Sequence, residues 1–294
     1  MAHSSLLTDH SQSQSSPPLP PPSLARFFCF LKAAFAVTDE GATAHTLTQH
    51  KIVEDRDRYL PFRQLGPSKR IILADPNGPF SSNRLKTQAG FFDALLFRLI
   101  TQASPILVQE KQVCFGSPQK FKEATEEREK KHYCHPTATG QHSRFLNIPH
   151  IPDYWKHASD WNDHINCADI TLESLLTWLG GSVGNKKRFF GIGNLVGWLL
   201  ASDYVYAGLV KMPEVSEVGE IIFKINAGGK HGLQLLGFNV DTKEACGEAM
   251  VSVWTAVHKF FTPAEIEEMG LDPITLEHAL CKFKRLQPSI TQVG

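Results

Sequence analysis

Apolar side chains recur at helical spacing along most of the chain after Gln88, and this periodicity constrains the fold more than any other feature. One such stripe is formed by Phe92, Leu95, Leu96, Leu99 and Ile100. Further helices are predicted at about 153–162, 169–179, 193–202, 214–226, 243–260 and 275–284. Extended segments are indicated only near 70–74 and 106–115. The sequence therefore predicts a mostly α-helical protein.

Composition changes along the chain and suggests three parts. Residues 1–22 are rich in proline and serine and cannot form a core, so a disordered tail is expected there. Residues 23–79 read as an irregular extension. Residues 80–287 are expected to form the helical domain, with a charged insertion near 105–148.

The charge balance limits the function classes. The chain has 294 residues, is 42% hydrophobic and has a formal net charge of zero, which excludes nucleic-acid binding through bulk positive charge but permits a local basic patch. The six cysteines are scattered and are read as reduced thiols. No apolar stretch is long enough for a membrane span. We expect a soluble protein of the nucleus or cytoplasm, without a membrane partner.

The segment from Lys186 to Leu200 is the most informative. Basic residues are followed by a Gly-x-Gly turn that opens an apolar helix, so backbone N–H groups at a helix N-terminus could hold a phosphate. Glycine also lets a phosphate approach the backbone closely. This helix-hairpin-helix is predicted to contact DNA without reading its sequence. The candidate DNA-binding residues are Lys186, Lys187, Arg188, Gly191, Gly193 and Asn194. A tight turn needed only for packing is the alternative.

Three further motifs follow this hairpin. Asp203 begins the run D-Y-V-Y one helix length after Gly193. A second glycine-rich run, N-A-G-G-K-H-G-L, contains Lys230 and His231. The run L-E-H-A-L-C-K-F-K-R lies near the C-terminus.

Taken together, F-F-G-I-G-N-L-V-G-W-L, S-D-Y-V-Y, I-N-A-G-G-K-H-G-L and L-E-H-A-L-C-K-F-K-R resemble the α-glutamyl/putrescinyl thymine pyrophosphorylases. With the helical domain of the 5-hydroxymethyluracil DNA kinases, these belong to the helix-hairpin-helix DNA-glycosylase superfamily. The helix with Phe91, Phe92, Phe97 and Arg98 is compatible with that family's N-terminal F-x-N-x-x-R region. The resemblance covers about 80–287 and is densest over 185–285.

The resemblance implies a glycosylase-like helical fold and a DNA-base modification. In the family, 5-hydroxymethyluracil in DNA is pyrophosphorylated, and an amine (an amino acid or polyamine) then displaces the pyrophosphate. The chain would be a transferase acting on an extruded base. Asp203 is the first candidate for the general base, and Lys230 and His231 are candidates for stabilising the pyrophosphate. Glu277 and His278 are second candidates, as an orienting or proton-transfer pair.

Two departures from the family pattern bear on these roles. Lys282 stands where the terminal block of the family has a carboxylate. In true glycosylases the catalytic Asp follows the hairpin at a longer spacing than Asp203 follows Gly193; Glu214 is nearer that spacing but lies in a different context. Base excision is therefore disfavoured, and a non-catalytic DNA-binding module or an all-α protein-interaction domain remain alternatives. The enzyme hypothesis requires Asp203, Lys230, His231 and Glu277 to converge on one pocket.

The predicted partners follow from these hypotheses. They are DNA, a small amine and a separate DNA-base kinase, because the chain has no G-x-x-x-x-G-K-[ST] phosphate-binding loop of its own. No cofactor is predicted. His132, Cys134, His135, His164 and Cys167 are residue types that bind zinc, but their spacing matches no standard zinc site, so no metal is assigned.

Overall fold

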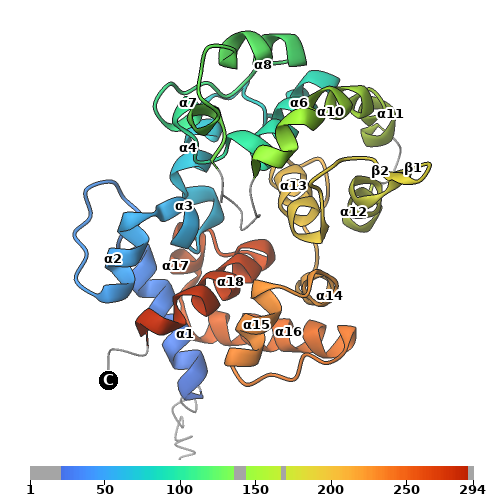
Figure 1. The fold of residues 1–294 in the computed structure, drawn as a ribbon. Helices are drawn as coiled ribbons and strands as arrows, with labels where there is room; N and C mark the ends of the chain where they lie inside the picture. Colours follow the sequence, from blue (N-terminus) through green and yellow to red (C-terminus); the bar gives the residue numbers. More distant parts are fainter. Residues whose placement is uncertain (1–20, 136–143, 167–169, 291–294) are drawn as a thin grey trace, which may run out of the picture.

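The computed structural model describes residues 21–135, 144–166 and 170–290. Within these ranges the chain is mostly α-helical, as the periodicity predicts, and its one sheet has two short strands. Figure 1 shows α13 in the middle of the molecule, with α6, α10 and α11 above it and α14–α18 below it. None of the helices in these ranges has both the length and the apolar character needed to cross a bilayer.

The N-terminal segment is a correction to the sequence prediction. Most of the irregular extension expected over 23–79 is helical: α1 (Pro22–Phe35), α2 (Leu47–Glu54), α3 (Arg56–Tyr59), the 3₁₀ turn η1 (Arg63–Leu65) and α4 (Pro67–Ala74). Phe27, Phe28 and Leu31 of α1 are buried and pack in the same core as the C-terminal helices. Most of the predicted tail, residues 1–20, lies outside the described residues.

The middle of the chain forms short helices around an apolar hub. These are α5 (Ser82–Leu85), α6 (Gln88–Leu96), the π-helical turn η2 (Phe97–Thr101), α7 (Pro105–Val108), α8 (Pro118–Thr125), α9 (Lys130–Tyr133), the 3₁₀ segment η4 (Arg144–His150), α10 (Ile151–Ala158) and α11 (Trp161–Ile165). Phe91 stacks on the buried Trp161 ring at 4.4 Å between centroids. The extended segments suggested near 70–74 and 106–115 are wrong: 70–74 belongs to α4, and 106–108 to α7.

The C-terminal part follows the predicted helices closely. It consists of α12 (Leu172–Gly180), β1 (Ser182–Val183), β2 (Lys186–Lys187), α13 (Asn194–Tyr206), α14 (Val215–Ile225), α15 (Gly228–Leu235), α16 (Lys243–Phe260), α17 (Pro263–Glu268) and α18 (Pro273–Ile290). The strands β1 and β2 were not predicted. Helix α15 was not predicted either, because three glycines in eight residues suggested a turn.

Close packing explains why α15 is helical despite its glycines. A Cβ atom on Gly232 would lie 2.5 Å from the backbone oxygen of Leu280 in α18, so only glycine fits at this contact. The backbones of α15 and α18 therefore touch directly, and this tertiary contact outweighs the low helix propensity of glycine.

Candidate functional site: a cationic cleft beside helix α13

A cleft lies between the N-terminal segment, η2, α13 and α18. Its volume is about 570 Å³, within the range typical of small-molecule sites. Helix α13 contributes Leu195 and Leu199, and α18 contributes His278, Cys281, Lys282 and Arg285. The cleft thus adjoins the first turns of the helix that the glycine turn opens.

The lining of this cleft is strongly positive although the whole chain is neutral. The acidic lining residues are Asp55 and Asp57. The cationic lining residues are Arg56, Arg58, Arg63, Lys69, Arg98, Lys282 and Arg285. Asp55 and Asp57 are engaged with the backbone, because they accept hydrogen bonds from the N–H groups of Arg58 and Ser68. Such a concave concentration of one sign of charge favours an anionic ligand.

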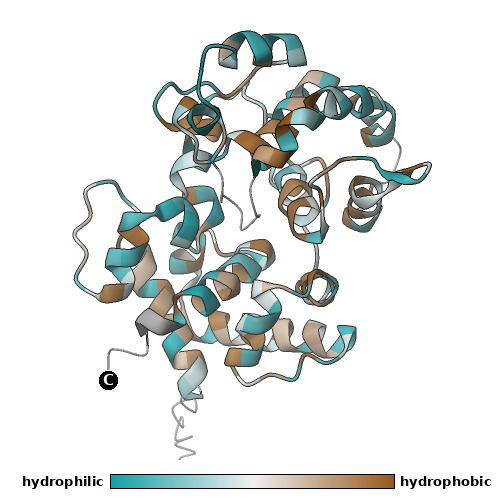
Figure 2. Ribbon diagram, viewed as in Figure 1, coloured by the Kyte–Doolittle hydropathy of each residue, from teal (hydrophilic) through white to brown (hydrophobic). Residues whose placement is uncertain are grey.

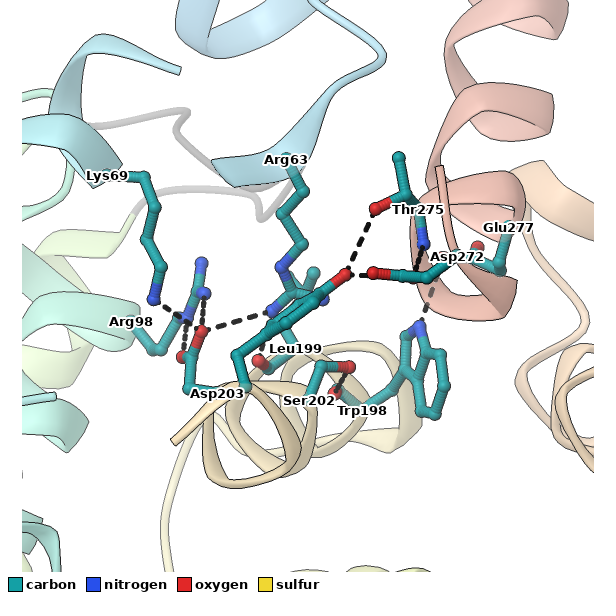
Figure 3. Close-up of polar contacts among 11 residues, drawn as sticks. Arg63, Lys69, Arg98, Trp198, Leu199, Ser202, Asp203, Asp272, Thr275 and Glu277 are labelled. Carbon is teal, nitrogen blue, oxygen red and sulfur yellow. Dashed lines mark hydrogen bonds and ion pairs between the residues drawn. The ribbon is translucent and has the colours of Figure 1, made fainter. Parts of the chain in front are cut away.

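Asp203, the first sequence candidate for the base, does not line the cleft but lies behind the lining residues Lys69 and Arg98, in an ion cluster. It is buried on α13 and accepts hydrogen bonds from Lys69 Nζ at 2.9 Å and from Arg98 Nε at 2.7 Å and Nη2 at 2.5 Å (Figure 3). Arg63 Nη2 is 3.5 Å from the same carboxylate. Three cations face one carboxylate, which leaves a surplus of two positive charges.

These cations control the protonation of Asp203. Burial by itself raises the pKa of Asp203, but the charges of Arg98, Lys69 and Arg63 outweigh burial and hold that pKa well below its usual range. A carboxylate this acidic, with both oxygens occupied by donors, is poorly suited to take a proton from an amine. The observed role of Asp203 is to position and partly neutralise the cations.

Burial of the cations in this cluster is electrostatically unfavourable, because it removes them from water. Burial lowers the pKa of Lys69 to about 8, although the negative charge of Asp203 opposes this shift. Burial also lowers the pKa of Arg63, and the nearby charge of Arg98 adds to this effect. The Nζ atom of Lys69 lies 3.8 Å from the centre of the Phe80 ring, a cation–π contact that replaces part of its lost hydration.

Arg98 is positioned by an unusual backbone. It belongs to the π-helical turn η2, and fully buried Arg144 donates hydrogen bonds to the carbonyl groups of Phe97, Arg98 and Leu99. The Phe97 carbonyl also accepts the Gln102 N–H, so Arg144 is a second donor there. The last carbonyls of a helix have few intrahelical donors, which leaves them free to accept from a side chain. Arg144 thus fixes the end of η2 and, with it, the direction of the Arg98 side chain.

The α18 side of the cleft carries two basic groups, the half-buried His278 and the buried Lys282. His278 Nδ1 lies 3.0 Å from the Pro61 carbonyl, so Nδ1 carries the proton and Nε2 keeps a lone pair. Burial, and then the charges of Lys282 and Arg63, lower the pKa of His278 well below its ordinary value, so the imidazole is neutral at pH 7. Lys282 Nζ donates to the Arg58 carbonyl at 2.5 Å, and burial lowers its pKa to about 8.

Glu277, next to His278 on α18, faces a different neighbour. Its Oε2 accepts a hydrogen bond from Trp198 Nε1 at 3.0 Å (Figure 3). Burial raises the pKa of Glu277, and the Trp198 hydrogen bond opposes that shift. Glu277 and His278 are therefore adjacent in sequence but have separate partners, and Glu277 links α18 to α13.

Lys230 and His231 do not join this site. Both are on α15; Lys230 Nζ lies over the Phe223 ring at 4.5 Å from its centre, and His231 is exposed. Neither lines the cleft. The convergence of Asp203, Lys230, His231 and Glu277 on one pocket, which the enzyme hypothesis required, is not found.

The segment predicted as a hairpin lies between two helices, as expected, but it contains two short strands that were not predicted. After α12 ends at Gly180, β1 and β2 pair antiparallel, and Gly193 is the N-cap of α13. The β1–β2 loop is largely hydrophilic (Figure 2). Gly191 has φ of +81°, and a Cβ atom there would be 2.5 Å from Asn147 Oδ1, so the turn requires glycine. The first helical amide bond runs from Gly197 N–H to the Gly193 carbonyl.

The polar residues of the hairpin differ in their accessibility. Lys186 and Lys187 are exposed and make no ion pair within the described ranges. Arg188 is only half-exposed: its guanidinium stacks on Trp178 at 4.5 Å and lies 3.6 Å from Asp160. The exposed Asn194 donates a hydrogen bond from Nδ2 to the Lys224 carbonyl. The two lysines are thus the accessible cations of this loop.

No known protein family, curated protein or solved structure matches this chain.

A metal site finds no support among the residues that the structure describes, where no group of three or more His, Cys, Asp or Glu side chains could hold an ion. His132 Nε2 instead lies 2.5 Å from Glu110 Oε1, and His164 stacks on Trp178. Cys167, part of the pattern noted in the sequence, falls outside the described residues.

Sequence reasoning missed Arg63 and Lys69, two of the three cations around Asp203. Both precede the predicted domain and lie more than a hundred residues from Asp203, so no motif spacing joins them. One signal was present: Lys69 is three residues before buried Ile72 in a short helix that starts at Pro67, which puts a cation on an apolar helix face.

Proposed function

We propose that the chain is a helix-hairpin-helix, glycosylase-like DNA-base modification protein that acts on pyrophosphorylated 5-hydroxymethyluracil in DNA and replaces the pyrophosphate with an amine. The observation that carries the proposal is the concentration of seven arginines and lysines in one cleft of a neutral chain. A pyrophosphorylated base brings several negative charges into such a cleft, which complements this lining.

The arrangement around α13 supports a DNA substrate. Gly193 opens the helix at the surface, whereas Leu195 and Leu199 of the same helix line the cleft. A strand bound at the helix start could therefore deliver an extruded base to the cleft without leaving α13. Extrusion costs a few kcal/mol, which phosphate contacts at the hairpin would offset.

The reaction proposed for the cleft is a substitution at the exocyclic carbon of the base. The lone pair of the amine forms the new C–N bond, the C–O bond to pyrophosphate breaks, and pyrophosphate leaves with the bonding electrons. The cations around Asp203 would stabilise the charge that develops on the leaving oxygen. They replace Lys230 and His231 in this role, because those two side chains lie outside the cleft.

The proton released by the amine needs an acceptor, and His278 is better suited to this role than Asp203. Its Nδ1–H group donates to the Pro61 carbonyl, so a neutral imidazole presents Nε2 as a base. Burial lowers its pKa, so the imidazole is unprotonated at neutral pH. Its hydrogen bond in the described structure is made by Nδ1, whereas both carboxylate oxygens of Asp203 accept from cations. Glu277, held by Trp198, would position the first turn of α18 rather than transfer the proton.

One observation favours a second candidate function. Asp203 is fully occupied by cations, and the four residues first proposed for catalysis do not share a pocket. A module that binds phosphorylated DNA bases without transforming them would need only the hairpin and the cationic cleft. The proposed separate kinase would supply its ligand.

Mass spectrometry of nucleosides separates the two functions. A duplex containing pyrophosphorylated 5-hydroxymethyluracil is incubated with the protein and with a panel of amino acids and polyamines, then digested. The modification hypothesis predicts a nucleoside whose mass reflects amine addition and pyrophosphate loss. An unchanged profile with every amine, together with retained binding of the duplex, would support the module instead.

Two variants make this experiment specific. His278→Gln should abolish amine transfer while leaving duplex binding intact, because the side chain is assigned to proton transfer. Lys122→Gln removes an exposed charge on α8, far from the cleft in Figure 1, and should change neither property. If neither modification nor salt-dependent duplex binding is detected, both DNA functions are refuted and the protein-interaction alternative remains.

A further inference from the structure

Arg63 has unused hydrogen-bonding capacity at the floor of the cleft. Its Nη2 atom donates to the Leu199 carbonyl and also faces Asp203. Its Nε and Nη1 atoms are buried and have no partner in the described structure. Arg63 is 6% exposed and lines the cleft, so two N–H-bearing atoms of a buried cation lack an acceptor. Leaving such donors unpaired is costly unless a ligand supplies the acceptor.

Lys282, which lines the same cleft from α18, is a second buried cation without a full set of partners. It is 5% exposed, and it makes no ion pair with a carboxylate within the described ranges. A buried ammonium held only by a carbonyl is incompletely neutralised. Arg285, one helical turn farther along α18, is exposed at the rim of the same cleft. The cleft is therefore lined by two buried cations that are incompletely neutralised, Arg63 and Lys282, and by the exposed cation of Arg285.

From this arrangement we infer that the cleft is a binding site for free inorganic pyrophosphate, with one phosphate group at the Arg63 guanidinium and the other reaching toward Lys282 and Arg285. A guanidinium with donors that lack an acceptor favours a phosphate oxygen as its partner. A single phosphate held by Arg63 would leave the α18 cations unpaired, whereas a diphosphate can address both walls. The inference deepens the proposed function, since pyrophosphate is its leaving group, but the site can be tested without DNA.

Binding is measured by isothermal titration calorimetry of the full-length chain with sodium pyrophosphate, and in parallel with inorganic phosphate. We expect saturable pyrophosphate binding at one site and binding of phosphate at least tenfold weaker. Equal affinity for the two anions would overturn the diphosphate assignment. Absence of both a binding signal and a rise in melting temperature with pyrophosphate would overturn the site itself.

Three variants test the assignment of residues. Arg63→Gln removes both unpaired donors and should weaken pyrophosphate binding about 10- to 100-fold, the effect of losing charge-assisted hydrogen bonds. Arg63→Lys keeps the positive charge but not the planar guanidinium, so it should recover only part of that loss. Arg285→Gln tests the rim with little risk to folding, because the side chain is exposed. Unchanged affinity in both Arg63→Gln and Arg285→Gln would refute the assignment.

A matched control and a parallel assay keep the two proposals separable. Lys122→Gln removes an exposed cation of α8 and should leave pyrophosphate affinity unchanged within twofold. Pyrophosphate binding without any binding or modification of DNA would support this site and refute the proposed function. If the protein modifies DNA but Arg63→Gln leaves its pyrophosphate affinity unchanged, the proposed function is supported and the pyrophosphate site is refuted.

Discussion

Helix α18 has two faces with opposite surroundings. One face meets α15 so closely that Gly232 leaves no room for a side chain beside the Leu280 backbone. The other, which carries His278, Lys282 and Arg285, borders an open cleft where cations outnumber acids. The first face is closely packed, whereas the second places the basic side chains of α18 beside a cleft that also holds the unpaired donors of Arg63. This contrast is the physical basis for assigning the cleft to a ligand.

The largest expected effect is on the cluster under the cleft. Asp203→Asn leaves Arg98, Lys69 and Arg63 without their buried counter-charge, so we expect the free energy of unfolding to fall by about 3–5 kcal/mol. Urea denaturation at pH 7 measures this change.

A surface carboxylate provides the control for this substitution. Glu54→Gln breaks an exposed pair with Lys51 and should cost under about 1 kcal/mol. Equal effects of the two substitutions would show that the Asp203 cluster is solvated rather than buried.

The next effect probes the packed face of α18. Gly232→Ala places a Cβ atom 2.5 Å from the Leu280 carbonyl, so α15 and α18 must separate. We expect a loss of about 1–3 kcal/mol in unfolding free energy. Pyrophosphate affinity of the folded protein should stay unchanged, because the cleft lies on the other face. A variant that loses affinity but not stability would contradict the separation of the two faces.

Lys282→Met should stabilise the protein at neutral pH, in contrast to Asp203→Asn and Gly232→Ala. The pKa of Lys282 falls from 10.5 to about 8 in the fold, so below pH 8 the folded state carries a penalised charge. The gain at pH 7 should be about 1–3 kcal/mol and should shrink as pH rises from 8 to 10.5, because wild-type Lys282 then deprotonates in the folded state first. Thermal denaturation at pH 7 and pH 10 measures the difference. A destabilised, pH-independent variant would show that the ammonium is well solvated.

The smallest effect on stability is expected at the rim. Arg285→Gln should alter the unfolding free energy by less than about 0.5 kcal/mol, as is usual for exposed side chains. The same substitution should reduce the slope of log affinity for duplex DNA against log salt by about 1, the loss of one phosphate contact. Fluorescence anisotropy at several salt concentrations measures this slope. An unchanged slope would exclude the rim from the DNA interface.

Local sequence patterns predicted the helices well because their evidence is local. Apolar spacing placed α13, α16 and α18 within a few residues of their observed bounds in most cases, and the glycine turn at Gly191 was recognised from its neighbours. Helix α15 was missed because its stability comes from contact with α18, which local propensity does not contain.

The candidate site was predictable only in part. Asp203 and His278 were chosen from motifs; His278 lines the cleft, and Asp203 lies behind its lining residues. The partners that fix their properties come from distant segments: Arg63 and Lys69 acidify Asp203, and the Pro61 carbonyl sets the tautomer of His278. Lys230 and His231 matched a motif equally well but lie on α15, so motif membership did not indicate which side chains share a pocket.

The central claim is that the cleft cations bind a phosphate-bearing ligand. A structure of crystals grown with pyrophosphate tests it most directly. The account predicts difference density in the cleft, with one phosphate group within hydrogen-bond distance of the Arg63 guanidinium and the second near Lys282 and Arg285. An empty cleft at saturating pyrophosphate, or pyrophosphate bound elsewhere on the chain, would contradict it.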